Sequence, residues 1–298
     1  MAKAESRHPG AATTGSSVIA SFAMLYEALL HLYGASWWDV TSGFFVDIGA
    51  YDGETKSCTA PLADGNWSGL MFEPGDAPYE LCRERHKDNK VKVIKQALSN
   101  FNGKLKFYKG TGENGIDFTA DPDAHAHYKF KNTNPAKEEY YKDELCLEEI
   151  KEQWTHELDV VTLDHFLQSK DFKGSIDVLR ISGVGHNLQI MQGLTKWRPA
   201  VIVTDHGPDP QNRGKQVAYY GSINYHMVLP MIFSELDTVG IAKTFNAFIT
   251  DRAWVFVRDP HLFANNEHVF CLDCTMLTEA MIALNKQGAL APDLVHTD

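Results

Sequence analysis

Short apolar runs rich in β-branched and aromatic residues recur along the chain, and polar turns or amphipathic stretches separate them. Runs of this kind predict strands, and stretches with helical spacing between them predict helices. Helices are predicted after Glu73-Pro74, from Leu163, and over residues 186–194. The predicted strands are Phe44–Ile48, Ser68–Phe72, Val91–Ile94 and residues 158–161, 176–181 and 199–203. Strands that alternate with helices predict a parallel sheet.

Three further segments complete the predicted fold. Residues 227–236 resemble a helix despite Pro230. Two hairpins are predicted, joining residues 97–98 to 105–108 across Asn102-Gly103 and residues 242–249 to 253–257 across Thr250-Asp251. The expected fold class is α/β, a doubly wound, mostly parallel seven-stranded sheet that ends in an antiparallel edge hairpin.

The segments outside this alternation have their own predicted roles. Residues 1–17 are rich in Ala, Ser, Gly and Thr and are expected to form a flexible leader, without the pattern of a secretory signal. Residues 18–38 are apolar, but Glu27 and His31 interrupt them, which favours a docked N-terminal helix over a membrane span. Residues 109–157 are polar and are interpreted as an insertion before the fourth strand, forming a lid or substrate wall. Residues 18–298 are expected to form a single domain.

Composition narrows the classes of partner. The formal net charge is −11 and no long Lys/Arg run occurs, which argues against nucleic acid as a partner. Five cysteines are an odd number, which favours a reducing compartment, here the cytoplasm. Cys271 and Cys274 have the spacing of half a zinc site, but no second half follows, so no metal is predicted.

The turn after the first predicted strand indicates the ligand. A dinucleotide site needs G-x-G-x-x-G, whereas this turn has only Gly49 and Gly53, with the bulky Tyr51 between them. Asp47 near the strand's end would repel a pyrophosphate but attract the sulfonium and ammonium groups of S-adenosylmethionine. Glu73 ends the second strand, where a carboxylate can bind ribose hydroxyls, a feature that NAD and S-adenosylmethionine share.

Several motifs along the chain resemble those of FkbM-type methyltransferases, a Rossmann-like class I family that mostly O-methylates sugars and other small-molecule hydroxyls. They are F-V-D-I-G-A-Y-D-G at 45–53, G-L-M-F-E-P at 69–74, Q-A-L-S-N-F-N-G at 96–103, V-T-L-D at 161–164 and I-D-V-L-R-I at 176–181. The resemblance implies S-adenosyl-L-methionine as the cofactor. It also implies that the following residues contact it: Asp47, Gly49, Ala50, Tyr51 and Gly53 at the methionine part, Glu73 and Pro74 at the ribose, Gln96, Ala97 and Leu98 at the adenine, and Ser182 after the fourth strand.

One motif departs from the family pattern. After the fourth strand the family usually reads K-I-D-V-E-G-A-E, whereas this chain reads R-I-S-G-V-G-H-N from Arg180 to Asn187. Ser182, Val184 and Asn187 therefore stand where carboxylates are expected. Any base, metal ligand or substrate contact that those carboxylates provide in the family is missing here.

Histidines could take over the chemistry. Transfer of a methyl group to a hydroxyl benefits from a general base, and imidazole has a suitable pKa. His186 follows the fourth strand, and His206 follows the fifth beside Asp205, which could orient it. The sequence thus predicts an O-methyltransferase acting on a small-molecule or glycan acceptor with His206, Asp205 and His186 as catalytic residues. A catalytically inactive, methyltransferase-like binding module and a NAD-dependent enzyme remain the alternatives.

Overall fold

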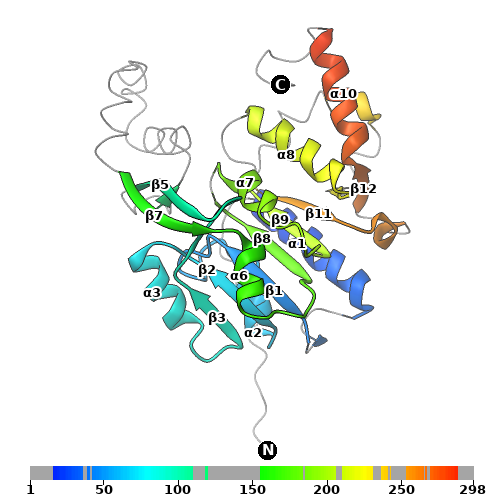
Figure 1. Cartoon of the computed structure of the whole chain (residues 1–298). Coiled ribbons are helices and arrows are strands. Elements are labelled where there is room, and N and C mark those ends of the chain that lie inside the picture. Colours follow the sequence, from blue (N-terminus) through cyan, green and yellow to red (C-terminus); the bar gives the residue numbers. More distant parts are fainter. Residues whose placement is uncertain are drawn as a thin grey trace, which may run out of the picture.

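A computed structural model describes residues 16–35, 39–40, 42–109, 118–119, 155–183, 185–205, 210–230, 236–240, 242, 253–264, 266 and 269–287. The molecule is built on one large twisted sheet with helices on both sides (Figure 1). The order of strands in this sheet is β3-β2-β1-β8-β9-β11-β10-β12. Their bounds are β1 Phe44–Ile48, β2 Ser68–Phe72, β3 Val91–Ile94, β8 Val178–Ile181, β9 Val201–Thr204, β10 His226–Pro230, β11 Trp254–Val257 and β12 Val269–Asp273.

The pairing of these strands confirms the predicted doubly wound, mostly parallel fold. The strands β3, β2, β1, β8 and β9 are mutually parallel, β11 is antiparallel to both β9 and β10, and β12 is antiparallel to β10. The sheet therefore contains the expected antiparallel end, with β12 as an additional edge strand. Most of the predicted hairpin arm at 242–249 lies outside the described residues.

Two local predictions are wrong. The segment predicted as a helix over 227–236 begins with the strand β10, because a short apolar run fits a buried strand as well as a helix. The predicted hairpin around Asn102-Gly103 does not form, because β7 lies between its two arms. The second, four-stranded sheet has the order β4-β7-β5-β6, with bounds β4 Ala97–Leu98, β5 Gly103–Lys109, β6 Phe118–Thr119 and β7 Thr155–Val161. The Asn102-Gly103 turn pattern carries no information about β7, a strand much later in the chain that is inserted between the two arms.

Apolar residues alternate between the two faces of the large sheet. In β9, Ile202 joins one core cluster, whereas Val201 and Val203 join the other. The first cluster includes side chains of α6, α7, α8 and α10, and the second includes those of α1 and α2. The helix bounds are α1 Ser16–Tyr33, α2 Ala60–Asp64, α3 Asp76–Arg85, α6 Leu163–Ser169, α7 Asn187–Gln192, α8 Pro210–Ser222 and α10 Cys274–Lys286, with the 3-10 helix η5 at Pro260–Phe263. Both faces are thus buried, as a parallel sheet requires.

The predicted N-terminal docking helix is present as α1. It begins at Ser16 and packs over β9, β10, β11 and η5, with Leu25 and Leu29 fully buried. Its polar residues face protein partners, since Asn266 Nδ2 lies 2.8 Å from Glu27 Oε1 and 3.0 Å from His31 Nε2. Within the described ranges, no helix is both long and apolar enough to cross a membrane.

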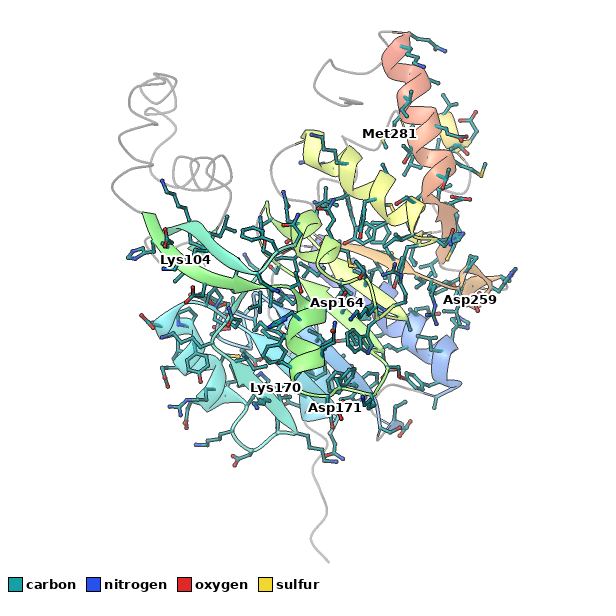
Figure 2. The ribbon with its side chains drawn as sticks, viewed as in Figure 1. Lys104, Asp164, Lys170, Asp171, Asp259 and Met281 are labelled. Atoms are coloured by element: carbon teal, nitrogen blue, oxygen red, sulfur yellow. The ribbon has the colours of Figure 1, made fainter. Side chains whose placement is uncertain are left out.

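The V-T-L-D motif fixes helix α6 to the rest of the domain. Figure 2 shows Asp164 in the middle of the molecule at the start of α6, with Lys170 and Asp171 beyond the other end of this helix. The Asp164 carboxylate accepts hydrogen bonds from Thr195 N at 2.9 Å and Oγ1 at 2.6 Å, and from Lys196 N at 3.2 Å. This motif residue therefore has a structural role. The insertion predicted at 109–157 begins with the end of β5, and residues 110–117 and 120–154 lie outside the described part.

Candidate functional site

The glycine turn after β1 is closely packed against two neighbouring strands. Gly49 N and Ala50 N donate to Phe72 O at 2.9 and 3.1 Å, which ties the turn to the end of β2. Gly49 has a φ of +76°, and a Cβ placed on it would lie 2.3 Å from Ser182 O at the end of β8. Gly53 also has a left-handed φ of +77°. Only glycine satisfies both the conformation and the close approach at Gly49.

Glu73 shapes the same turn from the end of β2. Its Oε2 accepts a hydrogen bond from Tyr51 N at 2.9 Å, and its Oε1 accepts one from Gly75 N at 2.8 Å. The side chain is only 6% exposed. Both of its carboxylate oxygens therefore bind backbone amide groups, one in the turn and one just after β2. The predicted ribose-binding residue therefore lies directly beside the predicted methionine-binding turn, and Pro74 follows it.

Asp47 lies beneath the turn rather than on its surface. It is fully buried in β1 and is paired in register with Arg180 of β8. Arg180 Nη1 donates to Asp47 Oδ1 at 2.8 Å, and Thr59 Oγ1 donates to the other carboxylate oxygen. Burial alone lowers the pKa of the Arg180 guanidinium, but Asp47, Cys58 and Asp205 together raise this pKa by more than burial lowers it, so Arg180 keeps its charge. The Asp47 carboxylate therefore already has a cationic partner within the protein.

Arg180 also contacts the backbone around the turn. Its guanidinium donates to Gly49 O at 3.3 Å and to Lys56 O at 3.4 Å. One planar cation thus joins the buried carboxylate of β1 to the carbonyl groups at both ends of the glycine-containing loop. Sequence reasoning missed this arrangement, although an arginine within an apolar strand is itself a signal of a buried anionic partner.

Polar side chains also join the carboxyl ends of β8 and β9. Ser182 Oγ donates to Asp205 Oδ2 at 2.6 Å. The fully buried Asn187 accepts from Gly183 N at 2.6 Å and donates to Asp205 O. Ser182 and Asn187, which stand where carboxylates were expected, therefore both bind Asp205. The Asp205 carboxylate is thus in direct contact with Ser182. Val184, the third replacement, lies outside the described residues.

His186 is held at the start of α7. Its Nε2 lies 3.0 Å from Oγ of the buried Ser99. Burial lowers the pKa of His186 to about 4, so its imidazole is neutral at physiological pH. Neutral imidazole can accept a proton, but the pKa of His186 is lower than the unperturbed histidine pKa of about 6.5, so it is a weaker base than the sequence led us to expect. His206, the other predicted base, lies outside the described residues.

This pKa has a measurable consequence for stability. Between about pH 6.5 and 4, unfolding exposes His186 and allows it to take up a proton that the folded protein excludes, so the free energy of unfolding falls as pH drops. From pH 7 to pH 5, wild type should lose about 2 kcal/mol relative to His186→Gln. Urea unfolding at both pH values measures this, with His165→Gln at an exposed position of α6 as the control. Equal pH dependence in wild type and His186→Gln would contradict the burial of neutral His186.

The residues predicted to border adenine lie at the junction of the two sheets. Gln96 Nε2 donates to Asp159 O at 2.7 Å and to Ala97 O at 3.1 Å. Ala97 and Leu98 are buried in β4, which pairs in parallel with β7. Their backbone and the Gln96 side chain are therefore fixed by the smaller sheet.

The two cysteines with the spacing of half a zinc site lie where β12 meets α10. Cys271 lies in β12 and Cys274 begins α10, and burial raises the pKa of both thiols to about 12. No group of three or more potential metal ligands occurs in the part of the chain that the structure describes. Cys271 and Cys274 thus belong to no such group among the described residues.

Comparison with known proteins assigns the chain to a family. A family model described as the methyltransferase FkbM domain matches residues 47–238, more than half of the chain. No curated protein matches the chain significantly. Among solved structures, the chain is similar to the S-adenosylmethionine-dependent methyltransferases of Geobacter sulfurreducens and Thiobacillus denitrificans, each in complex with S-adenosyl-L-homocysteine. Each is 10% identical, with a TM-score of 0.31, and the alignment covers 80% of this chain and 89% of the other.

Proposed function

This chain belongs to the FkbM family of S-adenosylmethionine-dependent methyltransferases, and we propose that it transfers the methyl group to a hydroxyl of a sugar or another small molecule. The observation that carries the proposal is the junction of the Gly49–Gly53 turn with Glu73, where a buried carboxylate holds the backbone of Tyr51. In this proposal the methionine part of the cofactor lies along the turn, its ribose hydroxyls donate to Glu73, and its adenine lies near Gln96, Ala97 and Leu98.

The role of Asp47 differs from a direct contact with the cofactor's positive charge. Because Arg180 and Thr59 bind both of its carboxylate oxygens, we assign Asp47 to positioning the turn. Because Arg180 neutralises Asp47, the negative electrostatic potential at the turn is weaker than a lone Asp47 carboxylate would produce. Glu73 is then the buried anionic group that the cationic cofactor would meet at this turn, and Asp52 is a more exposed one.

The chemical step is an in-line displacement. The acceptor hydroxyl oxygen forms a bond to the methyl carbon while the bond from that carbon to sulfur breaks, and the sulfonium becomes the neutral thioether of S-adenosylhomocysteine. The hydroxyl proton passes to a base, for which we propose His206 with Asp205, assisted by His186. This role is supported by the position of Asp205. Ser182 stands where the family has a carboxylate, and its Oγ donates to Asp205 Oδ2 at 2.6 Å, so the Asp205 carboxylate lies next to that position.

The proposed cofactor site predicts the effect of removing one carboxylate. Glu73→Ala deletes charge-assisted acceptors for the ribose and for Tyr51 N, and should weaken S-adenosylmethionine binding about 10- to 100-fold, equivalent to about 1–3 kcal/mol. Calorimetric titration measures this. Glu54→Ala is the matched control, since Glu54 is an exposed acid just after the turn that contacts Arg85 at 2.5 Å. Unchanged affinity in folded Glu73→Ala would remove Glu73 from the site.

An inactive, cofactor-binding module is the second candidate function. It is favoured by Ser182 and Asn187, which occupy family carboxylate positions and bind other protein groups. Such a module would bind S-adenosylmethionine but transfer no methyl group to any acceptor. Incubation with labelled S-adenosylmethionine and a panel of glycosides distinguishes the two functions.

We propose a cytoplasmic location and a single domain over residues 18–298. The four cysteines that the structure describes are free thiols, as expected in a reducing compartment. The lid at residues 109–157 stays a prediction, because residues 110–117 and 120–154 lie outside the described part of the chain. Nucleic acid stays an unexpected partner for a chain with a net charge of −11.

A further inference from the structure

One helix carries a buried polar side chain that the cofactor site does not use. Gln216 on α8 is fully buried, and among the described residues neither its amide oxygen nor its amide nitrogen has a hydrogen-bonding partner. Buried side-chain amides in native proteins nearly always have partners, so such a group requires an explanation. An unpartnered amide in the core would only weaken the fold unless a ligand or a water molecule completes its bonds.

A second polar group lies one helical turn away. Residues at i and i+4 share a helix face, so Tyr220 follows Gln216 along the same stripe. Tyr220 is also fully buried, and its hydroxyl has no partner of normal geometry within the described ranges, although Thr204 lies close enough to affect its ionisation. Its ring stacks on Phe256 with 4.2 Å between centroids, which fixes its position. The stripe therefore presents an amide and a hydroxyl on a rigid support.

Tyr220, at one end of the stripe, lies near Thr204, close to the candidate catalytic Asp205. Thr204 is the last residue of β9 and directly precedes Asp205. Helix α7, which follows Ser182 and His186, contacts α8, and its Gln189 has a buried amide oxygen that also lacks a partner in the described part of the chain. Figure 1 shows α7 and α8 next to each other beside β9. The amide atoms of Gln189 and Gln216 that lack a partner among the described residues thus belong to two helices that contact each other and that follow the carboxyl ends of β8 and β9, where ligands of open α/β sheets bind.

We propose that Gln216 and Tyr220 bind the methyl acceptor and select molecules with two neighbouring hydroxyl groups. This inference rests on the proposed methyltransferase function and names a recognition element for its acceptor. An amide offers a donor and an acceptor side by side, so it can bind adjacent hydroxyls, one through its oxygen and one through its nitrogen. A single alcohol satisfies only one of these groups and leaves the other buried without a partner, which is the basis of strong discrimination in buried polar sites.

A ligand-observed binding experiment tests the proposal with simple probes. Saturation-transfer NMR is performed on the full chain with bound S-adenosylhomocysteine, using trans-1,2-cyclohexanediol, methyl α-D-glucopyranoside and cyclohexanol. These probes have similar rings but differ in neighbouring hydroxyls. Wild type should bind the diol and the glycoside at least about tenfold more tightly than cyclohexanol.

Variants locate the binding to the stripe. Gln216→Leu should weaken diol binding at least about tenfold while the melting temperature of the ligand-free protein stays equal or rises, because the leucine carries no unpartnered amide. Tyr220→Phe, which removes only the hydroxyl, should also weaken binding and keeps the test valid should Gln216→Leu fail to fold. Gln168→Leu makes the same replacement at an exposed position of α6 and should change nothing.

The outcomes separate this inference from the proposed function. Failure of wild type to bind S-adenosylhomocysteine would count against the methyltransferase function itself. Normal cofactor binding with no preference for the diol, or with equal diol binding in all variants, would overturn only the acceptor assignment. A lower melting temperature of Gln216→Leu with unchanged diol binding would show that Gln216 serves a structural water instead.

Discussion

Replacing Arg180 with methionine is expected to destabilise the protein by about 3–5 kcal/mol, the usual effect of leaving a buried charge without its partner. Without Arg180, the buried Asp47 carboxylate has no cationic partner, because its remaining described side-chain partner is the neutral Thr59. The contacts of Arg180 with Gly49 O and Lys56 O disappear as well. Urea unfolding at pH 7 measures the change.

Two comparisons give this prediction its specificity. Arg85→Met breaks the exposed pairs with Glu54 and Asp64, at 2.5 and 2.7 Å, and should cost at most about 1 kcal/mol. Arg180→Lys keeps a cation beside Asp47 but loses the planar contacts to the backbone, so its effect should lie between the two. A loss below about 1 kcal/mol in Arg180→Met would mean that the ion pair does not support the turn.

Asp205→Asn should reduce kcat by about 10²-fold while the affinity for S-adenosylmethionine stays the same. The carboxylate is proposed to orient and stabilise the imidazolium that forms when the acceptor hydroxyl loses its proton, and a general base system contributes on this scale. The asparagine keeps an oxygen that can accept the hydrogen bond from Ser182, so the local structure should persist. Turnover of a glycoside acceptor together with calorimetric binding measures both quantities.

A structural role for Asp205 would give a different pattern. If its function were only to hold Ser182, then Ser182→Ala should reduce kcat as much as Asp205→Asn does. We expect Ser182→Ala to remain within about tenfold of wild type, because the carboxylate is retained. Asp88→Asn, at an exposed position, is the control for a general loss of negative charge. Full activity of Asp205→Asn would exclude it from the catalytic step.

The parts of the fold that follow from local sequence were predictable. The segment from Phe44 to Gly53 shows an apolar run, a glycine and a polar continuation, and this pattern alone specifies a strand followed by a turn. The position of Glu73 follows equally, because it ends the next apolar run. The docked helix α1 was predictable because Glu27 and His31 interrupt its apolar run, and in the structure both side chains contact Asn266.

The remaining features depend on contacts between distant segments. The pairing of Asp47 with Arg180 requires the register between β1 and β8, which are separated by more than a hundred residues. The hairpin predicted at Asn102-Gly103 does not form because β7 is inserted between its arms. Likewise, β10 is a strand rather than a helix because its apolar run is buried within the sheet. The depressed pKa of His186 likewise arises from burial that no local pattern reveals.

The central claim is that the turn between β1 and Glu73 binds S-adenosylmethionine. Calorimetric titration of the full chain with S-adenosylmethionine, S-adenosylhomocysteine and NAD tests it most directly. We expect the first two to bind at one site per chain and Glu73→Ala to weaken both. NAD should not bind, because the turn lacks the glycines that a pyrophosphate needs. Binding of NAD, or no binding of either S-adenosyl compound to the folded protein, would contradict it.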